Sequence, residues 1–232
     1  MALKQDLEVA VKKIFSESWD SRPGRVVPAP EDLGLGNDAI KLDATVLYAD
    51  IADSTKLVDT SDSHFAAEVY RSYLTCAARI VKANDGVITA YDGDRIMGVF
   101  IGDQKNSNAV KAAMQINASV LKIVNPALAQ QYPNAAYRLR HVIGIDTSDL
   151  FVARIGVRND NDLVWVGRAA NHAAKLASIN EDNTMFITAD VYNKLPSNRK
   201  LGGINNTPMW KPRKWSQMGD LSIYSSNWTW NV

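Results

Sequence analysis

Two stretches decide the fold: Thr45-Val-Leu-Tyr-Ala-Asp50-Ile-Ala-Asp-Ser-Thr55 and Val87-Ile-Thr-Ala-Tyr-Asp-Gly-Asp94-Arg-Ile-Met-Gly-Val-Phe100. Each is an apolar, strand-like run that ends or pauses at a carboxylate, and the only neighbouring basic residue is Arg95. The first stretch then turns into a Ser/Thr helix start, and the second predicts a hairpin with Gly93-Asp94 near its tip. Two strands that bring aspartates to one edge of a sheet, beside a helix N-terminus, form a site for a divalent metal and polyphosphate.

Length and composition limit the kind of protein. The chain has 232 residues, of which 46% are hydrophobic, enough for one sizeable core but too few for two full domains. Its 26 lysines and arginines nearly balance its 25 aspartates and glutamates. A chain without excess basic charge has no general attraction to nucleic acid or to an anionic membrane. We therefore expect neither as a partner.

The single cysteine and the N-terminal sequence predict a cytoplasmic protein. Cys76 has no second cysteine to pair with, which is typical of a reducing compartment. No sequence feature near it lowers a thiol pKa, so we expect a small buried residue and not a nucleophile. No apolar run is long enough to span a bilayer, and the charged start Met1–Leu7 predicts a helix and not a signal peptide.

Residues 3–19 are predicted to form an amphipathic helix. One face carries an apolar stripe that must pack on the body or on a partner. The stripe consists of Leu3, Leu7, Ala10, Val11, Ile14 and Phe15. A stretch rich in proline and glycine follows, from Pro23 to Gly36, and indicates a linker or a draped loop. We therefore divide the chain into an N-terminal helix with its linker, residues 1–39, and a compact catalytic domain, residues 40–232.

The compact domain alternates strand and helix patterns. The predicted strands are 44–51, the hairpin 87–101, 137–147, 149–156, 161–167, 184–188 and a last hairpin around Gly219-Asp220. The predicted helices are 62–84, 105–130 and 169–179. This order, β-α-β-β-α-β with extra strands and an N-terminal helical extension, predicts an α+β fold close to the ferredoxin-like plan. We expect the helices on one face of the sheet.

Each candidate aspartate also has a plain structural interpretation. An aspartate just after a strand, such as Asp50, often caps the next helix or turn, and Asp53 is the better capping candidate because it stands at the chain reversal. Asp92 and Asp94 share one strand face by the alternation of side chains. The combination favours function, because carboxylates brought together without cations require a metal.

The segment Val164–Ser178 supplies the complement to these carboxylates. A strand runs into a helix on which Asn171 and Lys175, four residues apart, share one face. Taken alone, Lys175 is equally typical of a solvated surface and Asn171 of a helix start. The three histidines, His64, His141 and His172, lack metal-ligand spacing and are interpreted as structural.

Together, these blocks resemble the class III nucleotidyl cyclases, the adenylate and guanylate cyclase family. The family shows a strand ending Phe-Ala-Asp-Ile-x-x-Phe-Thr, a hairpin with Gly-Asp-x-x-Met-x-x-Phe and a Gly-x-x-x-Asn-x-x-x-Arg helix. Here these motifs stand as Tyr48–Thr55, Gly93–Phe100 and Gly167–Lys175. Ile143–Thr147, with Ile155-Gly156, is similar to the family's Ile-Gly-Ile-His-Thr-Gly strand pair. The likeness runs from about residue 44 to about residue 180.

The resemblance implies a role for each matching residue. Asp50 and Asp94 would hold two Mg²⁺ or Mn²⁺ ions per active site, with the Ile51 carbonyl as an extra ligand. Asn171 would orient the ribose, and Lys175 replaces the arginine that stabilises charge on the α-phosphate. Backbone N–H groups at the helix start would cradle the outer phosphates. These groups belong to Ala52, Asp53, Ser54 and Thr55.

The chain departs from the family pattern in two places. A lysine offers a point charge where an arginine offers a fork, so we expect Lys175 either to be a weaker substitute or to work with Arg168. The family's C-terminal phosphate-binding lysine is replaced by Met218, with Lys211, Arg213 and Lys214 as candidate substitutes. Family active sites form between two domains. Because this chain holds both the aspartates and the Asn–Lys helix, the resemblance implies a head-to-tail homodimer with two shared sites.

The two residues that read the ring in purine cyclases correspond here to Ala90 and Val164, which cannot donate or accept a hydrogen bond. Each missing contact to a buried base edge costs about 1–3 kcal/mol, so a selective adenylate or guanylate cyclase is disfavoured. The remaining candidate base contacts are Tyr48, Asp92, Arg95 and Arg168. Tyr48 is alternatively a plain core aromatic.

An aromatic that narrows the pocket suits a single-ring base. In this the chain resembles the bacterial pyrimidine cyclases of the Pycsar anti-phage systems. That resemblance implies conversion of UTP, or next CTP, to a 3′,5′-cyclic monophosphate that activates a partner effector. Three alternatives stay open: an adenylate cyclase with atypical base contacts, a catalytically weak nucleotide-binding module, and a polymerase-type palm, which the balanced charge disfavours.

Overall fold

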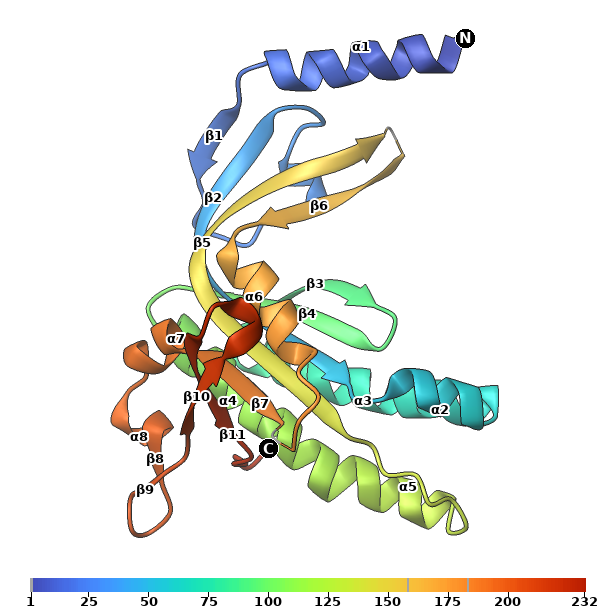
Figure 1. The fold of residues 1–232 in the computed structure, drawn as a ribbon, viewed down its shortest axis with the longest axis vertical. Coiled ribbons are helices and arrows are strands. Elements are labelled where there is room, and N and C mark those ends of the chain that lie inside the picture. The colour runs from blue at the N-terminus through green and yellow to red at the C-terminus, as the bar shows by residue number, and fades with distance from the viewer. Residues whose placement is uncertain (1, 158, 183) are drawn as a thin grey trace.

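The computed structural model describes residues 2–157, 159–182 and 184–232 (Figure 1). Its strands are β1 (Asp20–Pro23), β2 (Asp38–Ile51), β3 (Val87–Asp92), β4 (Arg95–Ile101), β5 (His141–Val157), β6 (Asp160–Val166), β7 (Met185–Thr188), β8 (Leu201–Gly202), β9 (Thr207–Pro208), β10 (Lys211–Trp215) and β11 (Leu221–Ser226). Its α-helices are α1 (Ala2–Ser16), α2 (Ser54–Thr60), α3 (Ser63–Ala83), α4 (Lys105–Ser119), α5 (Asn125–Gln131), α6 (Arg168–Ala177), α7 (Ala189–Lys194) and α8 (Ser197–Lys200).

The central sheet confirms the predicted α+β plan. Strands β5, β2, β4 and β3 lie side by side in that order, and each neighbouring pair is antiparallel. This is the strand order of a ferredoxin-like βαββαβ unit. Beyond β5 the sheet continues through β7, which is parallel to β5, and then through β11 and β10. The predicted hairpin around Gly219-Asp220 is the β10–β11 pair.

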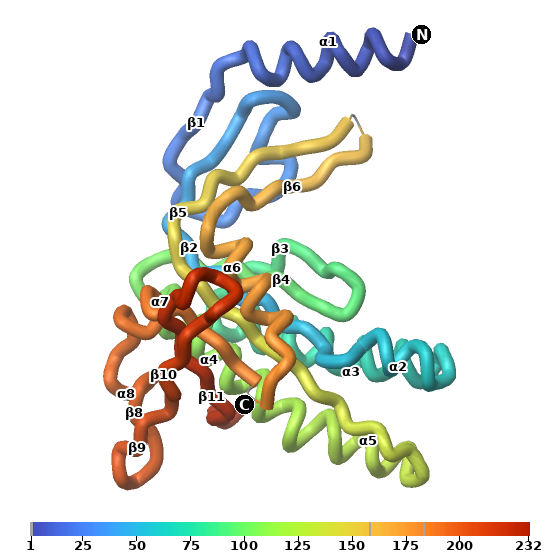
Figure 2. The backbone as a smooth tube through the Cα atoms, viewed as in Figure 1, coloured from blue at the N-terminus to red at the C-terminus, as the bar shows by residue number. Residues whose placement is uncertain are grey.

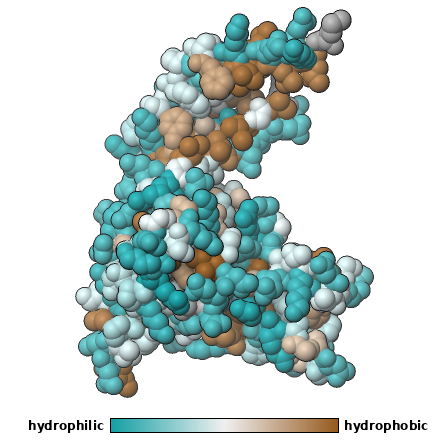
Figure 3. All heavy atoms as spheres, in the orientation of Figure 1, coloured by the Kyte–Doolittle hydropathy of each residue, from teal (hydrophilic) through white to brown (hydrophobic). Residues whose placement is uncertain are grey.

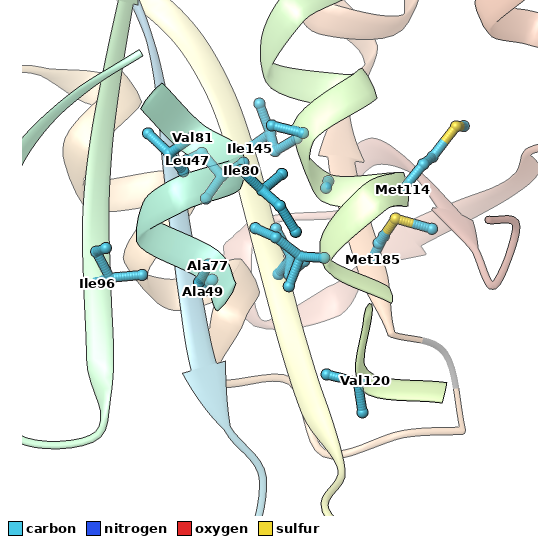
Figure 4. Close-up of a cluster of buried hydrophobic side chains, with 14 of the residues drawn as sticks. Leu47, Ala49, Ala77, Ile80, Val81, Ile96, Met114, Val120, Ile145 and Met185 are labelled. Atoms are coloured by element: carbon cyan, nitrogen blue, oxygen red, sulfur yellow. The ribbon is translucent and has the colours of Figure 1, made fainter. Parts of the chain in front are cut away.

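Both faces of the central strands are buried, although we predicted helices on one face only. Leu47 and Ala49 of β2 face a core formed with α3 and α4, part of which Figure 4 shows. Val46 and Ala44 point the other way, into a second core that includes Ala169 and Ala173 of α6. A strand covered on both sides carries a continuous apolar run, which is the pattern of residues 46–49.

Helix α6 can lie flat on the second face because β5 presents a glycine beneath it. A Cβ atom at Gly144 would come within 2.1 Å of the Ala173 carbonyl oxygen and 2.6 Å of the Ala177 amide nitrogen. Only glycine permits backbone approach this close. The helix that carries Asn171 and Lys175 is therefore fixed tightly against the central sheet.

β2 and β5 are longer than predicted and extend past the body of the domain. Residues 137–147 and 149–156 were predicted to be two strands, whereas β5 runs unbroken from His141 to Val157. Pairing with β2 on one side carries Ser148 and Asp149 through the expected break. With β6, the far half of β5 forms a hairpin that projects from the body (Figures 1 and 2).

The N-terminal segment is docked on this extension. β1 pairs in parallel with β2. The proline- and glycine-rich stretch that follows is attached to the sheet at both ends, by the Gly24 N–H, which donates to the Lys41 carbonyl oxygen at 2.8 Å, and by a bridge between Leu35 and Arg154. The side-chain amide of Asn37 donates to the carbonyl oxygens of Ile14 and Glu17, at 3.0 and 2.7 Å, and holds the end of α1. The structure describes every residue of α1, and none of them is buried. The predicted apolar stripe therefore does not pack on the body.

The predicted helix 105–130 is divided. A π-helical turn, Val120–Val124, separates α4 from α5. Within the described parts of the chain, no helix combines the length and the apolar character needed to cross a membrane.

Candidate active site

The register of the sheet brings Asp50 and Asp94 together. Asp50 stands at the end of β2 and pairs with Arg95, the first residue of β4, and Asp94 is the turn residue just before it. The Asp94 carboxylate lies close enough to Asp50 to affect its ionisation. Burial raises the pKa of Asp50 to about 7; the Asp94 charge adds to the shift and the Arg95 guanidinium opposes it.

The expectation that Asp92 and Asp94 share one strand face is wrong. β3 ends at Asp92, and Gly93, with a φ of +62°, turns the chain, so the alternation of the strand stops before Asp94. The Asp92 side chain is instead exposed and paired with Arg95, whose Nε lies 3.1 Å from Oδ2 of Asp92. Asp94 reaches Asp50 because it belongs to the turn.

Four of the six predicted base contacts lie on the face of the sheet that carries Asp50. Pairing across β2, β4 and β3 places Tyr48, Ala90, Asp92 and Arg95 there. The Arg95 guanidinium carbon is 5.7 Å from the centroid of the Tyr48 ring. Burial raises the pKa of Tyr48, so its hydroxyl keeps its proton at neutral pH and is a hydrogen-bond donor.

The other two predicted base contacts make different neighbours in this protomer. Val164 pairs with Ala153 in the β5–β6 hairpin. Arg168 donates from Nη2 to the Thr147 carbonyl oxygen at 2.7 Å, and its Nε lies 3.2 Å from the Asp146 carboxylate. The guanidinium of Arg168 is therefore already engaged on β5.

The predicted phosphate cradle is partly occupied by the chain itself. The Ala52 N–H donates to the Arg140 carbonyl oxygen at 2.9 Å. Asp53 precedes α2 but does not cap it: its φ is +58°, its side chain makes no capping bond, and its carboxylate lies 3.5 Å from Nη1 of Arg140. The N–H groups of Ser54 and Thr55 lie in the first turn of α2, where a helix has no acceptors of its own.

Asn171 and Lys175 are exposed on α6. Nζ of Lys175 is 3.7 Å from Sδ of Met218, the residue that replaces the family lysine. Lys175, Met218 and Arg95 line a cavity of about 410 Å³. Among the described residues, no hydrogen bond or ion pair joins Asn171 or Lys175 to Asp50 or Asp94.

The three candidate substitutes for the missing lysine lie on β10. Nη1 of Arg213 is 3.2 Å from the Glu181 carboxylate, and Nζ of Lys214 is 3.0 Å from the Ser222 hydroxyl. Lys211 is exposed.

Residues 40–207, well over half of the chain, match the family of the adenylate and guanylate cyclase catalytic domain. The chain belongs to this cyclase family. A protein of Burkholderia cepacia named uridylate cyclase is 48% identical to it over 234 residues, which cover 100% of each chain. The family match and this full-length relative identify the chain as a nucleotidyl cyclase.

Solved cyclase structures share the fold of this cyclase. The guanylyl cyclase Cya2 superposes with a TM-score of 0.69 at 17% identity and covers 82% of this chain and 94% of its own. A guanylyl cyclase domain from the fungus Blastocladiella emersonii, described as a non-canonical dimer, gives a TM-score of 0.61 at 14% identity. That match covers 80% of this chain and 97% of the fungal one.

Class III cyclase domains use divalent metal ions, and the aspartate pair of this cyclase fits such ions. Oδ2 of Asp94 is buried without a hydrogen-bond partner among the described residues. Within residues 2–157, 159–182 and 184–232, no three His, Cys, Asp or Glu side chains converge as a metal cluster. A site with only two carboxylates suits Mg²⁺, which is commonly held by one or two carboxylates together with substrate phosphates.

Sequence reasoning missed the buried carboxylate of this cyclase that holds the start of α6. Asp146 is fully buried on β5. Its Oδ2 lies 3.2 Å from Nε of Arg168 and 3.2 Å from Nδ1 of His172, and its Oδ1 accepts from the Thr188 hydroxyl at 2.5 Å. The available signal was an aspartate directly after the apolar run Val142–Ile145, because a carboxylate in a buried strand requires a partner.

A pair of buried aromatic side chains behind the cyclase's β2 was also missed. The rings of His141 and Tyr73 lie 5.8 Å apart, and neither His141 nitrogen has a hydrogen-bond partner among the described residues. Burial lowers the pKa of His141 from 6.5 to about 4. His141 is therefore neutral in the folded cyclase, in agreement with its interpretation as structural.

This shift predicts a pH-dependent stability. Between its folded and unfolded pKa values His141 binds a proton only in the unfolded chain, so its stabilising contribution is present above 6.5 and is lost as the pH falls toward 4. Lowering the pH from about 7.5 to about 5.5 should reduce the free energy of unfolding by about 1 kcal/mol more in the wild type than in His141→Leu.

Urea denaturation of both proteins at the two pH values checks this expectation. The difference between the two proteins is the decisive quantity, because Asp50, whose pKa is raised, acts with the opposite sign over part of the same range. Equal pH slopes in the two proteins would exclude a buried neutral His141.

Proposed function

We propose that this cyclase converts UTP to 3′,5′-cyclic UMP and pyrophosphate, with CTP as the second substrate. The full-length relative named uridylate cyclase supports the choice of base. The observation that carries the proposal is the cluster of Tyr48, Arg95 and Asp92 on the face of Asp50. Ala90, on the same face, offers no polar atom to a purine.

The chemistry of this cluster favours uracil. The Tyr48 hydroxyl and the Arg95 guanidinium are hydrogen-bond donors, and uracil presents two carbonyl oxygens. The Asp92 carboxylate is an acceptor suited to the N3–H of uracil. Cytosine replaces one carbonyl by an amino group, which repels the guanidinium donors and leaves one of them unpaired. We therefore place UTP ahead of CTP.

The reaction needs positioning and charge stabilisation. Asp50 and Asp94, with the Ile51 carbonyl, would hold two Mg²⁺ or Mn²⁺ ions, and these would lower the pKa of the ribose 3′-hydroxyl and offset triphosphate charge. The 3′-oxygen bonds to the α-phosphorus, the bond from that phosphorus to the bridging oxygen breaks, pyrophosphate leaves, and the hydroxyl proton passes to solvent.

The remaining residues act on the phosphates and the ribose. Lys175 stabilises charge on the α-phosphate, and Asn171 orients the ribose. The N–H groups of Ser54 and Thr55 bind the outer phosphates at the start of α2. Ala52 does not contribute its N–H in this arrangement, because Arg140 accepts it.

We propose a head-to-tail homodimer in which each site takes Asp50 and Asp94 from one protomer and Asn171 and Lys175 from the other. The exposure of both α6 residues, and the lack of any contact to the aspartates among the described residues, support this arrangement.

Residues 40–232 are the proposed catalytic domain, and residues 1–39 an addition to it. The chain resembles the Pycsar cyclases, and on that basis we propose that its product is an anti-phage messenger. The messenger would act on a cyclic-nucleotide-binding effector in the cytoplasm.

Incubation with each of the four ribonucleoside triphosphates tests the proposal. With Mn²⁺ and purified protein, we expect cyclic UMP as the main product by mass spectrometry, and at least about a tenfold preference over ATP and GTP, which is the cost of one missing polar contact. A dominant cyclic AMP peak would establish the alternative of an adenylate cyclase with atypical base contacts. No product from any nucleotide, together with nucleotide binding, would establish a catalytically weak binding module.

A further inference from the structure

The buried carboxylate of Asp146 touches the helix that carries Asn171 and Lys175, and the proposed reaction does not use it. Oδ2 of Asp146 lies 3.2 Å from Nε of Arg168 and 3.2 Å from Nδ1 of His172. Among the described residues no aligned hydrogen bond reaches Oδ2, so this oxygen attracts two donors at once. Apolar residues that replace a buried ion pair often leave a protein as stable or more stable. Stability alone therefore gives no reason for an aspartate here.

Arg168 and His172 lie along the flank of α6. Successive residues of an α-helix are rotated by about 100°. On this geometry the two residues lie between the buried side of α6 and the exposed side, which carries Asn171 and Lys175. In Figure 3 the part of the body where α6 lies is mostly hydrophilic, whereas apolar side chains gather on α1 and the β5–β6 hairpin. The contacts to Asp146 therefore hold the flank that adjoins the exposed pair.

The buried side of α6 fixes the distance of the helix from the sheet more firmly than its rotation. Four of its five buried residues are alanines, and they are Ala169, Ala170, Ala173 and Ala177; the fifth is Leu176. With Gly144 beneath them, these small side chains let the helix lie close to β5. Interdigitating side chains fix one element against another, and a methyl group projects too little to do so well. The polar contacts of Asp146 are left to set the rotation of α6 about its axis.

His172 connects these contacts to the surroundings of Lys175. On one side the His172 ring faces Asp146, and on another it meets the Trp215 ring edge-to-face, with centroids 5.7 Å apart. Trp215 lines the cavity of about 410 Å³ together with Lys175 and Met218. Lys175 follows His172 by three residues and lies beside it, one turn along the helix. A rotation of α6 that separated His172 from Asp146 would carry Lys175 with it.

We propose that Asp146 is a positioning residue for the cyclase reaction. Through His172 and Arg168 it sets the rotation of α6, and thereby the direction in which Asn171 and Lys175 reach the ribose and the α-phosphate. The proposal rests on the roles given to Asn171 and Lys175 in the proposed function and adds the residue through which the fold holds them. Because a misplacement of about 1 Å costs about a hundredfold in rate, a group that fixes this rotation matters to the reaction.

The two donors differ in how much they depend on Asp146. Nη2 of Arg168 donates to the Thr147 carbonyl oxygen at 2.7 Å and lies 2.5 Å from the Asp190 carboxylate. Within the described parts of the chain, Asp146 is the only group that forms an ion pair or a hydrogen bond with His172. Loss of the Asp146 charge should therefore release His172 and leave Arg168 in place.

A matched pair of substitutions tests the proposal. Asp146→Asn removes the charge and keeps an oxygen that can accept from the Thr188 hydroxyl. With the nucleotide that the wild type turns over, we expect kcat to fall at least about tenfold and KM to change less than about threefold, because Asn171 and Lys175 act in the transition state. Asp190→Asn is the same change in the other carboxylate beside Arg168 and should keep kcat within about twofold.

A double variant separates positioning from a general loss of structure. If Asp146 acts through the side chains of α6, Asp146→Asn should lower kcat less than about threefold in a chain that already carries Lys175→Ala. Two independent effects would instead multiply. Multiplied effects, or wild-type kcat in Asp146→Asn, would overturn the proposal.

His172→Phe tests the same contact from the helix side, even where Asp146→Asn does not fold. It keeps a ring against Trp215 and removes the nitrogen that faces Asp146. We expect kcat to fall about fivefold or more, with KM again little changed. A folded His172→Phe variant with wild-type kcat would overturn the proposal.

Histidine NMR provides a readout that needs no catalysis. In long-range ¹H–¹⁵N spectra, with the signal assigned by its absence in His172→Phe, we expect the proton of His172 on Nδ1, facing the Asp146 carboxylate. In Asp146→Asn the His172 signals should move while those of His141 stay in place. Unmoved His172 signals would contradict the contact itself. Moved signals with unchanged kcat would instead show that the roles given to Asn171 and Lys175 are wrong, and would overturn the proposal through them.

Discussion

Asp50→Asn is expected to lower kcat/KM for cyclic UMP formation at least about a thousandfold, which corresponds to about 4 kcal/mol of lost transition-state stabilisation. Asparagine keeps the shape of the side chain but removes the charge that we propose holds a divalent ion beside Asp94. Asp94→Asn should have an effect of the same size, because the two carboxylates act as one site. Product formation is measured by mass spectrometry at saturating Mn²⁺.

The folded state of Asp50→Asn should remain intact, which separates catalysis from stability. Burial, and to a smaller extent the charge of Asp94, raises the pKa of Asp50 to about 7. The ionised form of Asp50 is therefore unfavourable in the metal-free protein. At about pH 8 without metal, the variant should therefore be at least as stable as the wild type to urea. Added Mn²⁺ should stabilise the wild type and not the variant.

Asp103→Asn is the matched control, an exposed aspartate just beyond β4 and outside the proposed site. It should retain wild-type activity and its stabilisation by Mn²⁺. Full activity in Asp50→Asn, or an equal Mn²⁺ response in Asp50→Asn and the wild type, would show that the aspartate pair does not hold the metal.

A heterodimer of Asp50→Asn and Asn171→Ala chains is expected to recover about half of the wild-type activity, although each variant is inactive as a homodimer. In a site shared between protomers, one of the two sites in this heterodimer combines both defects and the other combines neither. Two affinity tags, one on each chain, allow the heterodimer to be purified after co-expression. The rate per dimer is the quantity compared.

The reciprocal heterodimer makes the result decisive. A wild-type chain paired with a chain that carries both substitutions should be nearly inactive, because each shared site then contains one defect. If Asp50 and Asn171 instead acted within one chain, the two heterodimers would exchange their activities. Each heterodimer contains the same two substitutions, once each, and the same two tags, so the two arrangements are matched in composition.

Local sequence was sufficient for the strands and the turn that carry the aspartates. An apolar run that ends at Asp50, and a second run interrupted by Gly93-Asp94, each contain their own strand and turn signals, and both elements formed as predicted. The same local logic failed at Ser148-Asp149, where polar residues indicated a break. Pairing with β2 supplies backbone hydrogen bonds that no local pattern contains, so the strand continues.

Side-chain partners from distant elements were beyond the reach of the sequence. Asp53 looked like a helix cap, but Arg140 lies beside it only after β2 and β5 have paired. Arg168 was a candidate base contact, yet Asp146 of β5 and Asp190 of α7 engage its guanidinium. Each outcome depends on which charges the fold brings within a few ångströms, and spacing along the chain does not encode that distance.

The amino-acid sequence by itself determined the family, the α+β fold and the strands and turn that carry Asp50 and Asp94, because these depend on residue type and on periodicity over fewer than about twenty residues. Only the tertiary structure decided how Asp50 ionises, which face of the sheet α6 covers, and that the α1 stripe lies open. Those properties are set by burial and by contacts between residues that are far apart in the chain, and these contacts exist only in the folded protein.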